Sequence, residues 1–169
     1  SHPTGPHKTE SKGAVIHPDA PEKMFALGVE TIKALAPLLH EGWVYRGEYL
    51  QQPKHNVLAY KRVPKLHIII YDIDTAQQCY LSFKDKAAEA RRLGLEVVPV
   101  LYYGHGETLI MDTFQDLLSI DSMLGGQRIE GMVIKNYNRY DVDAKVLMGK
   151  HVSEAFKEIH ADEWRTANP

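Results

Sequence analysis

The segment EGMVIKNYNR, residues 130–139, places an acid and a lysine at the two ends of a short apolar run. Glu130 and Lys135 are five residues apart, and an odd separation puts two side chains on opposite faces of a regular strand. Both can face one ligand only if the strand bends or if one of them lies beyond its end. Gly131 permits such a bend at little cost. The pair therefore has two interpretations, the charged ends of an ordinary strand or two groups that face a bound nucleotide.

Two other apolar segments carry a side chain suited to contact with a ligand. Glu48 follows Gly47 in YRGEYL, and a glycine inside a strand often marks a close approach to the backbone, here by a ligand. Tyr71 ends the apolar run of IIIYDID, where an aromatic ring can stack on a purine base, typically worth ~1–3 kcal/mol. The alternatives are an exposed glutamate beside a bulge and a core tyrosine with its hydroxyl at the rim. Asp72 and Asp74 could also simply cap a turn.

Lysines in the segment KVLMGKHVSEAF are candidates for binding phosphate. Lys145 and Lys150 fall in a predicted strand, turn and helix. A lysine ammonium is a compact, strongly hydrated charge that suits phosphate, although each could equally be a solvated surface charge. The nine histidines show no metal-ligand spacing, and we expect Cys79 to be a buried structural thiol.

Length and composition fit one globular domain. The chain has 169 residues, of which 44% are hydrophobic, so it can build a core. Its net charge of −2 argues against coating nucleic acid by bulk charge but leaves room for a local basic groove. A lone cysteine excludes an intramolecular disulfide, and a cytoplasmic, reducing setting is expected. No apolar run approaches the roughly 20 residues that cross a bilayer, so we expect no membrane partner.

The hydrophobic pattern mixes helices and strands without a regular βαβ alternation. It predicts helices over 21–40, 82–93, 113–123 and 153–164, and strands over 43–50, 66–74, 95–104, 131–137 and 144–148. The unbroken apolar centre of 66–74 predicts burial on both faces. Ser82, three residues before Asp85, predicts a helix N-cap, and Thr113 with Asp116 repeats this pattern for the helix that follows. Pro99 predicts an edge strand or a bulge. The expected fold is α+β, with a mainly antiparallel sheet and flanking helices.

Four segments in this order resemble motifs III, IIIa, IV and V of the covalent nucleotidyltransferases, namely YRGEYLQ, IIIYDID, EGMVIK and KVLMGKHVSEAF. That superfamily contains ATP-dependent polynucleotide ligases and mRNA capping enzymes. RGEYLQQPKHNVLAYKRVP and MGKHVSEAFKE look most like the RNA ligases, and the resemblance covers roughly residues 43–158. It implies a ligase-type adenylation domain that uses ATP and Mg²⁺ to join 5′-phosphate and 3′-hydroxyl RNA ends. Lysyl-AMP and 5′-adenylated RNA are the implied intermediates.

The resemblance also implies a role for each candidate residue. Glu48 would contact the AMP ribose, and Tyr71 would stack on the adenine. Glu130 would help to place a metal ion or the nucleophile. Lys135 and Lys150 would hold the α-phosphate, where negative charge builds up during the transfer.

Two features depart from the family pattern. Lys145 is the alternative to Lys150 in motif V, because the family often has a K-x-K pair there and this chain has Leu147 where the second lysine would stand. The nucleophile motif K-x-D-G should precede motif III, and the chain contains no such sequence. We therefore expect an irregular segment over 1–20 and the C-terminal portion of an adenylation domain over 21–169. The nucleophile would then lie before Ser1, and this chain alone would be inactive.

Two alternatives remain open at the level of the sequence. A DNA ligase of the same superfamily would also carry RGE and EGMVIK. A non-catalytic module that binds nucleotide or nucleic acid is favoured by the missing lysine motif and disfavoured by the retained Glu48, Glu130 and Lys150.

Overall fold

The computed structural model describes residues 8–11, 14–16, 19, 22–55, 58–108, 110–154 and 156–157. Most of the helix expected over 153–164 falls outside these residues, although Glu154, Phe156 and Lys157 are helical. The segment 1–20 was expected to be irregular, but its described part contains a short antiparallel pair. This pair joins β1 (Glu10–Ser11) to β2 (Ala14–Val15).

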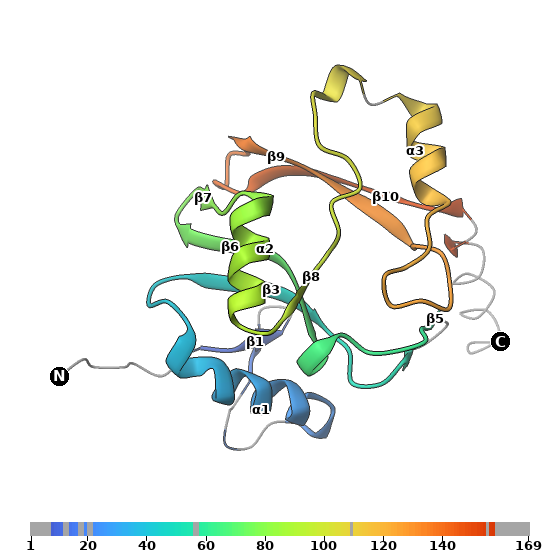
Figure 1. Ribbon diagram of the computed structural model, residues 1–169. Coiled ribbons are helices and arrows are strands. Elements are labelled where there is room, and N and C mark those ends of the chain that lie inside the picture. The colour runs from blue at the N-terminus through green and yellow to red at the C-terminus, as the bar shows by residue number, and fades with distance from the viewer. Residues whose placement is uncertain are drawn as a thin grey trace.

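A mixed sheet built around one long strand forms the centre of the fold (Figure 1). Its strands are β3 (Val44–Tyr49), β6 (Ile68–Ala76), β7 (Cys79–Tyr80) and β8 (Glu96–Val97). β3 and β7 pair with β6 in antiparallel fashion, whereas β8 pairs with it in parallel. The strand expected over 95–104 is thus reduced to two residues ahead of Pro99, which has no N–H to donate to a ladder.

Burial of β6 on both faces confirms the prediction from its apolar centre. Ile69 and Ile70 are consecutive, so they point to opposite faces, and both are buried. Ile73, further along the strand, is 1% exposed. The main core cluster contains Leu35, Ile70, Ile73, Ala90, Leu93 and Leu95. The core therefore lies between β6 and the segments that contribute the other members.

The helix expected over 21–40 is interrupted near both ends. A 3₁₀ turn, η1 (Lys23–Phe25), precedes α1 (Ala26–Leu35), and a second, η2 (Ala36–Leu38), follows it. Pro37 lies in η2, where its ring prevents the regular helix from continuing. No helix in the described part of the chain is long and apolar enough to cross a bilayer.

The other two helices test the capping predictions with different results. Ser82 caps α2 (Phe83–Arg92) as expected, because its side-chain oxygen accepts a hydrogen bond from the Asp85 N–H. α3 (Met111–Leu118) instead begins two residues before Thr113 and ends well before Met123. Its N-cap is Ile110, which makes no side-chain cap, so the expected capping pattern was wrong there.

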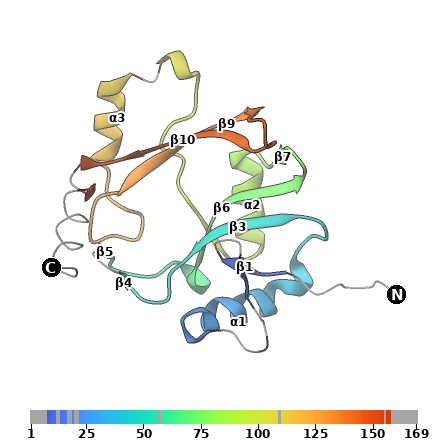
Figure 2. The same ribbon diagram turned by 180° about the vertical axis from the view of Figure 1, so that it is seen from behind.

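Two hairpins complete the fold. A small one pairs β4 (Lys54–His55) with β5 (Leu58–Ala59), and a long one pairs β9 (Gly131–Tyr140) with β10 (Val146–Val152). The long hairpin lies beside the central sheet, on the side away from α1 (Figures 1 and 2). Both of its strands extend beyond the residues predicted from the sequence, at their C-terminal ends.

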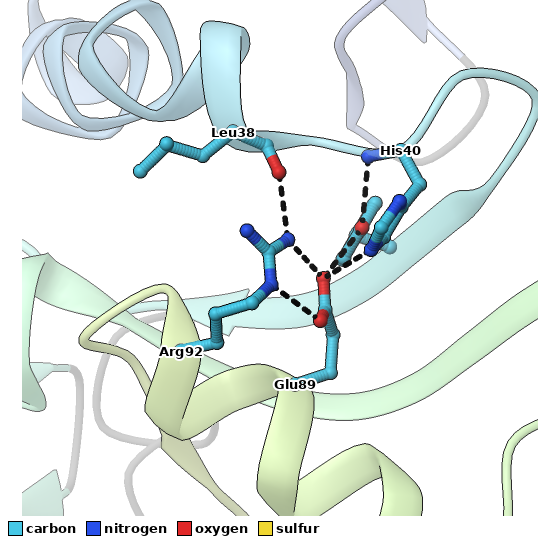
Figure 3. A network of polar contacts seen from close by, with 5 residues as sticks. Leu38, His40, Glu89 and Arg92 are labelled. Carbon is cyan, nitrogen blue, oxygen red and sulfur yellow. Dashed lines mark hydrogen bonds and ion pairs between the residues drawn. The ribbon is translucent and has the colours of Figure 1, made fainter.

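A buried glutamate fastens α2 to the segment that follows α1 (Figure 3). Glu89 accepts hydrogen bonds from the Arg92 Nε and Nη2 at 2.8 and 2.6 Å and from the Tyr45 hydroxyl at 2.9 Å. Arg92 also donates to the Leu38 carbonyl oxygen at 2.6 Å, and His40 Nε2 lies 3.7 Å from Glu89 Oε1. The hydrogen bonds from Arg92 are the main reason why the pKa of Glu89 lies below its ordinary value.

The variant Glu89→Gln tests this network through its pH dependence. Because folding lowers the pKa of Glu89, its contribution is present above the ordinary value of 4.5 and is lost as the pH falls through the folded-state pKa. We expect Glu89→Gln to lose about 2 kcal/mol of unfolding free energy at pH 7, and clearly less at pH 3. Urea titrations at both pH values measure the difference. Glu30→Gln, at an exposed position of α1, is the control and should match the unmodified chain at both. An equal loss for Glu89→Gln at both pH values would contradict this account.

Candidate functional site

A buried carboxylate in β6 holds two side chains of the long hairpin. Asp72 is 4% exposed, and its Oδ2 lies 2.5 Å from the Lys135 Nζ. Its Oδ1 accepts a hydrogen bond of 2.6 Å from the Tyr137 hydroxyl. Asp72 therefore does not cap a turn, and Lys135 reaches the central sheet from β9.

Lys86 of α2 adds a second cation to this cluster. Its Nζ donates to the Tyr71 carbonyl oxygen at 2.7 Å and lies 4.0 Å from Asp72 Oδ1. Burial lowers the pKa of Lys86, and the nearby Asp72 carboxylate opposes that shift. Lys86 was not among the residues predicted from the sequence. A signal was present, because Lys86 stands four and seven positions before Ala90 and Leu93, on the buried face of the helix.

The Tyr71 ring lies beside the Lys135 ammonium. Lys135 Nζ is 5.1 Å from the ring centroid, within the range of a cation–π contact. Burial is the largest cause that raises the pKa of Tyr71, and the Glu48 carboxylate is the next. Both the Lys135 ammonium and the Glu48 carboxylate therefore act on the Tyr71 ring, although the three side chains come from three different strands.

Glu48 stands next to a bulge in the pairing of β3 with β6, where Tyr71 of β6 is the extra residue. The pairing of β3 with β6 shifts between Arg46 and Gly47, and a Cβ on Gly47 would lie 2.7 Å from the Ile69 carbonyl oxygen. The close approach at this glycine is thus made by β6, as the bulge interpretation required. Glu48 itself is exposed. Bulges commonly redirect a side chain near functional sites, so an exposed Glu48 remains compatible with contact to a ligand.

Glu130 lies one residue before β9, so it escapes the alternation of that strand. This position answers the spacing problem posed by the sequence, because one of the two charges stands beyond the strand end. The Tyr60 hydroxyl donates to Glu130 Oε1 at 2.6 Å. Burial and this bond to Glu130 raise the pKa of Tyr60, and Glu48 contributes a smaller share. The Glu48 carboxylate therefore contributes to the raised pKa of both Tyr60 and Tyr71.

The register of the long hairpin decides which lysine of KVLMGK shares a face with Lys135. Lys150 is directly opposite Val133, and residues opposite each other in an antiparallel pair share a face. Val133 and Lys135 are two residues apart in β9, so they also share that face. Lys150 is exposed there. Lys135 and Lys150 are thus brought to one face of the hairpin.

Lys145 lies outside this arrangement. It precedes β10 in the hairpin turn, where its side chain is 73% exposed and its Nζ lies 3.9 Å from Asp143 Oδ2. The structure therefore separates Lys145 from Lys135, whereas it brings Lys150 to the face that Lys135 shares.

Two further sequence expectations concern Asp74 and Cys79. Asp74 of β6 forms an ion pair with Arg46 of β3, so it joins two strands and does not cap a turn. Cys79 of β7 is exposed, which contradicts the expected buried thiol. β7 is a two-residue strand that pairs only with the end of β6, so it is too short to be covered on both faces.

The described residues gather no group of three or more His, Cys, Asp and Glu side chains that could hold a metal ion. A cage built entirely of protein ligands is therefore not formed by this part of the chain. Mg²⁺ commonly takes only one or two carboxylates and completes its shell with phosphate oxygens and water. Glu130 fits that mode as a single carboxylate ligand.

The sequence was also compared with known proteins. The family model "RNA ligase" matches residues 11–152, which include all of the candidate residues. The chain therefore belongs to the RNA ligase family. No match was found among curated proteins or among solved structures.

The variant Asp72→Asn tests whether the buried carboxylate joins the hairpin to the sheet. It leaves two neighbouring lysines without their buried counter-charge, so we expect a loss of roughly 3 kcal/mol of unfolding free energy. Asp143→Asn is the matched control, because its ion pair with Lys145 is exposed, and it should change stability by less than about 0.5 kcal/mol. Denaturant titration at neutral pH measures both. Equal stability of the two variants would show that the Asp72 carboxylate does not join the hairpin to the sheet.

Proposed function

We propose that this chain is part of an adenylation domain that handles AMP during the joining of RNA ends. The reaction would link a 5′-phosphate to a 3′-hydroxyl through lysyl-AMP and 5′-adenylated RNA, with ATP and Mg²⁺. The observation that carries the proposal is the shared face of Lys135 and Lys150, beside Tyr71 and Glu48. Membership of the RNA ligase family supports it.

The proposed chemistry needs a stacking surface next to positive charge. Tyr71 would stack on the adenine, and Glu48 would contact the ribose hydroxyls. Lys135 and Lys150 would neutralise the charge that develops on the α-phosphate oxygens during in-line transfer. Since Lys135 already lies beside the Tyr71 ring, one site can recognise both the base and the phosphate.

Glu130 would hold Mg²⁺ together with phosphate oxygens of the bound nucleotide. The ion would supply further neutralisation of phosphate charge. Tyr60 would fix the Glu130 carboxylate through its 2.6 Å hydrogen bond, so that one oxygen stays oriented while the other remains available.

The nucleophilic lysine is proposed to lie upstream of Ser1. None of the lysines in this chain stands in a K-x-D-G sequence. Lys135 and Lys150 are therefore assigned to phosphate binding and not to covalent catalysis.

Intact-mass spectrometry after incubation with ATP and MgCl₂ tests this assignment. We expect the complete gene product to gain the mass of one AMP and this chain, incubated beside it, to gain none. A stable AMP adduct on this chain would contradict the assignment of its lysines, and no adduct on either protein would favour a non-catalytic binding module. Sealing of nicked RNA in preference to nicked DNA by the complete gene product would separate an RNA ligase from a DNA ligase.

Substitutions of the two candidate lysines of motif V are expected to differ in their effect on the rate of AMP-adduct formation by the complete gene product. Lys150→Ala should slow formation of the AMP adduct by about 100-fold, the usual cost of removing one group that stabilises transition-state charge. Lys145→Ala is the control and should stay close to the unmodified rate, because Lys145 lies in the hairpin turn. The rate is measured by quenched-flow labelling with radioactive ATP. A larger effect at Lys145 than at Lys150 would reverse the assignment.

A further inference from the structure

We propose that Tyr137 is a positioning residue that holds Lys135 in place through the carboxylate of Asp72. The part of this proposal that concerns phosphate rests on the proposed function. The part that concerns the placement of Lys135 rests on geometry alone.

The two side chains divide one carboxylate between them. Lys135 and Tyr137 are two residues apart in β9 and share a face, so both reach Asp72. Lys135 takes Oδ2 and Tyr137 takes Oδ1. A bond to each oxygen fixes the rotation of the carboxylate about its Cβ–Cγ bond, and therefore the direction in which Oδ2 faces Lys135.

The Tyr137 hydroxyl is suited to this role. Burial is the largest cause that raises its pKa, and the hydrogen bond to Asp72 is the next, so the phenol stays neutral and donates. The ring packs against Tyr80, with ring centroids 5.4 Å apart. A phenylalanine at position 137 would keep this ring contact and remove only the hydroxyl.

Lys86 provides a competing partner for the same carboxylate. Its Nζ lies 4.0 Å from Asp72 Oδ1, the oxygen that Tyr137 occupies. Without the Tyr137 hydroxyl, this oxygen would be buried without its donor, which costs free energy, and Lys86 is the donor nearby that could restore a partner. The carboxylate would then turn toward Lys86 and loosen its hold on Lys135.

Tyr137→Phe tests the placement of Lys135 without any nucleotide. The full chain is treated briefly with acetic anhydride, and the acetylation of each lysine is measured by peptide mass spectrometry, with the exposed Lys145 as internal reference. We expect Lys135 to react severalfold faster in Tyr137→Phe than in the unmodified chain. Tyr140→Phe is the matched control, because the Tyr140 hydroxyl donates to the carbonyl oxygens of Gln78 and Tyr137 and not to Asp72. An unchanged Lys135 rate in Tyr137→Phe, or an equal rise in Tyr140→Phe, would overturn the proposal.

Calorimetric titration with AMP and with adenosine tests the consequence for phosphate binding. Tyr137→Phe should bind AMP about tenfold more weakly, because one charge-assisted contact is misplaced, and should bind adenosine as before. Lys135→Met should lose the preference for AMP in the same way. A general disturbance of the fold would weaken the binding of both ligands together. The ratio of the two affinities therefore separates a positioning role from structural damage.

The two experiments fail in distinguishable ways. The proposed nucleotide site is wrong if the unmodified chain does not bind AMP, or if it binds AMP no more tightly than Lys135→Met does. The acetylation result then still decides whether Tyr137 positions Lys135. If AMP binding depends on Lys135 but Tyr137→Phe behaves like the unmodified chain in both experiments, only the role of Tyr137 is wrong.

Discussion

The buried carboxylate of Asp72 is the contact on which the geometry of the site depends. It stands on the central strand and binds a lysine and a tyrosine from a hairpin that lies more than 60 residues further along the chain. A buried charge is tolerated only when it is paired and hydrogen-bonded. The need to satisfy Asp72 therefore fixes the position of β9 relative to β6, and with it the position of Lys135.

The hairpin is also held at its other end. Tyr60 binds Glu130 just before β9, and Glu48 interacts with both Tyr60 and Tyr71. Lys135, which Asp72 holds, and Lys150 lie on one face of the hairpin. Acidic groups thus lie beside a face that carries positive charge, which is the arrangement that the proposed nucleotide site requires.

Local patterns predicted the parts of the fold that depend on local physics. The apolar run of β6 and the Ser82 cap each follow from neighbouring residues. The contacts of Asp72 with Lys86 and Tyr137 could not be predicted, because they depend on which distant elements meet. Whether Lys145 or Lys150 shares a face with Lys135 likewise depends on the register of the hairpin, which the sequence left open. The spacing of Glu130 and Lys135 did indicate a bend or a strand end, and the structure shows the strand end.

The most direct test of the account is a titration of the isotopically labelled chain with AMP, followed by nuclear magnetic resonance. The account predicts that the largest chemical-shift changes fall on Tyr71, Lys135, Glu48 and Lys150, with Lys145 unaffected. Changes confined to the hairpin turn around Lys145, or no saturable change at millimolar AMP, would show that the face shared by Lys135 and Lys150 is not a nucleotide site.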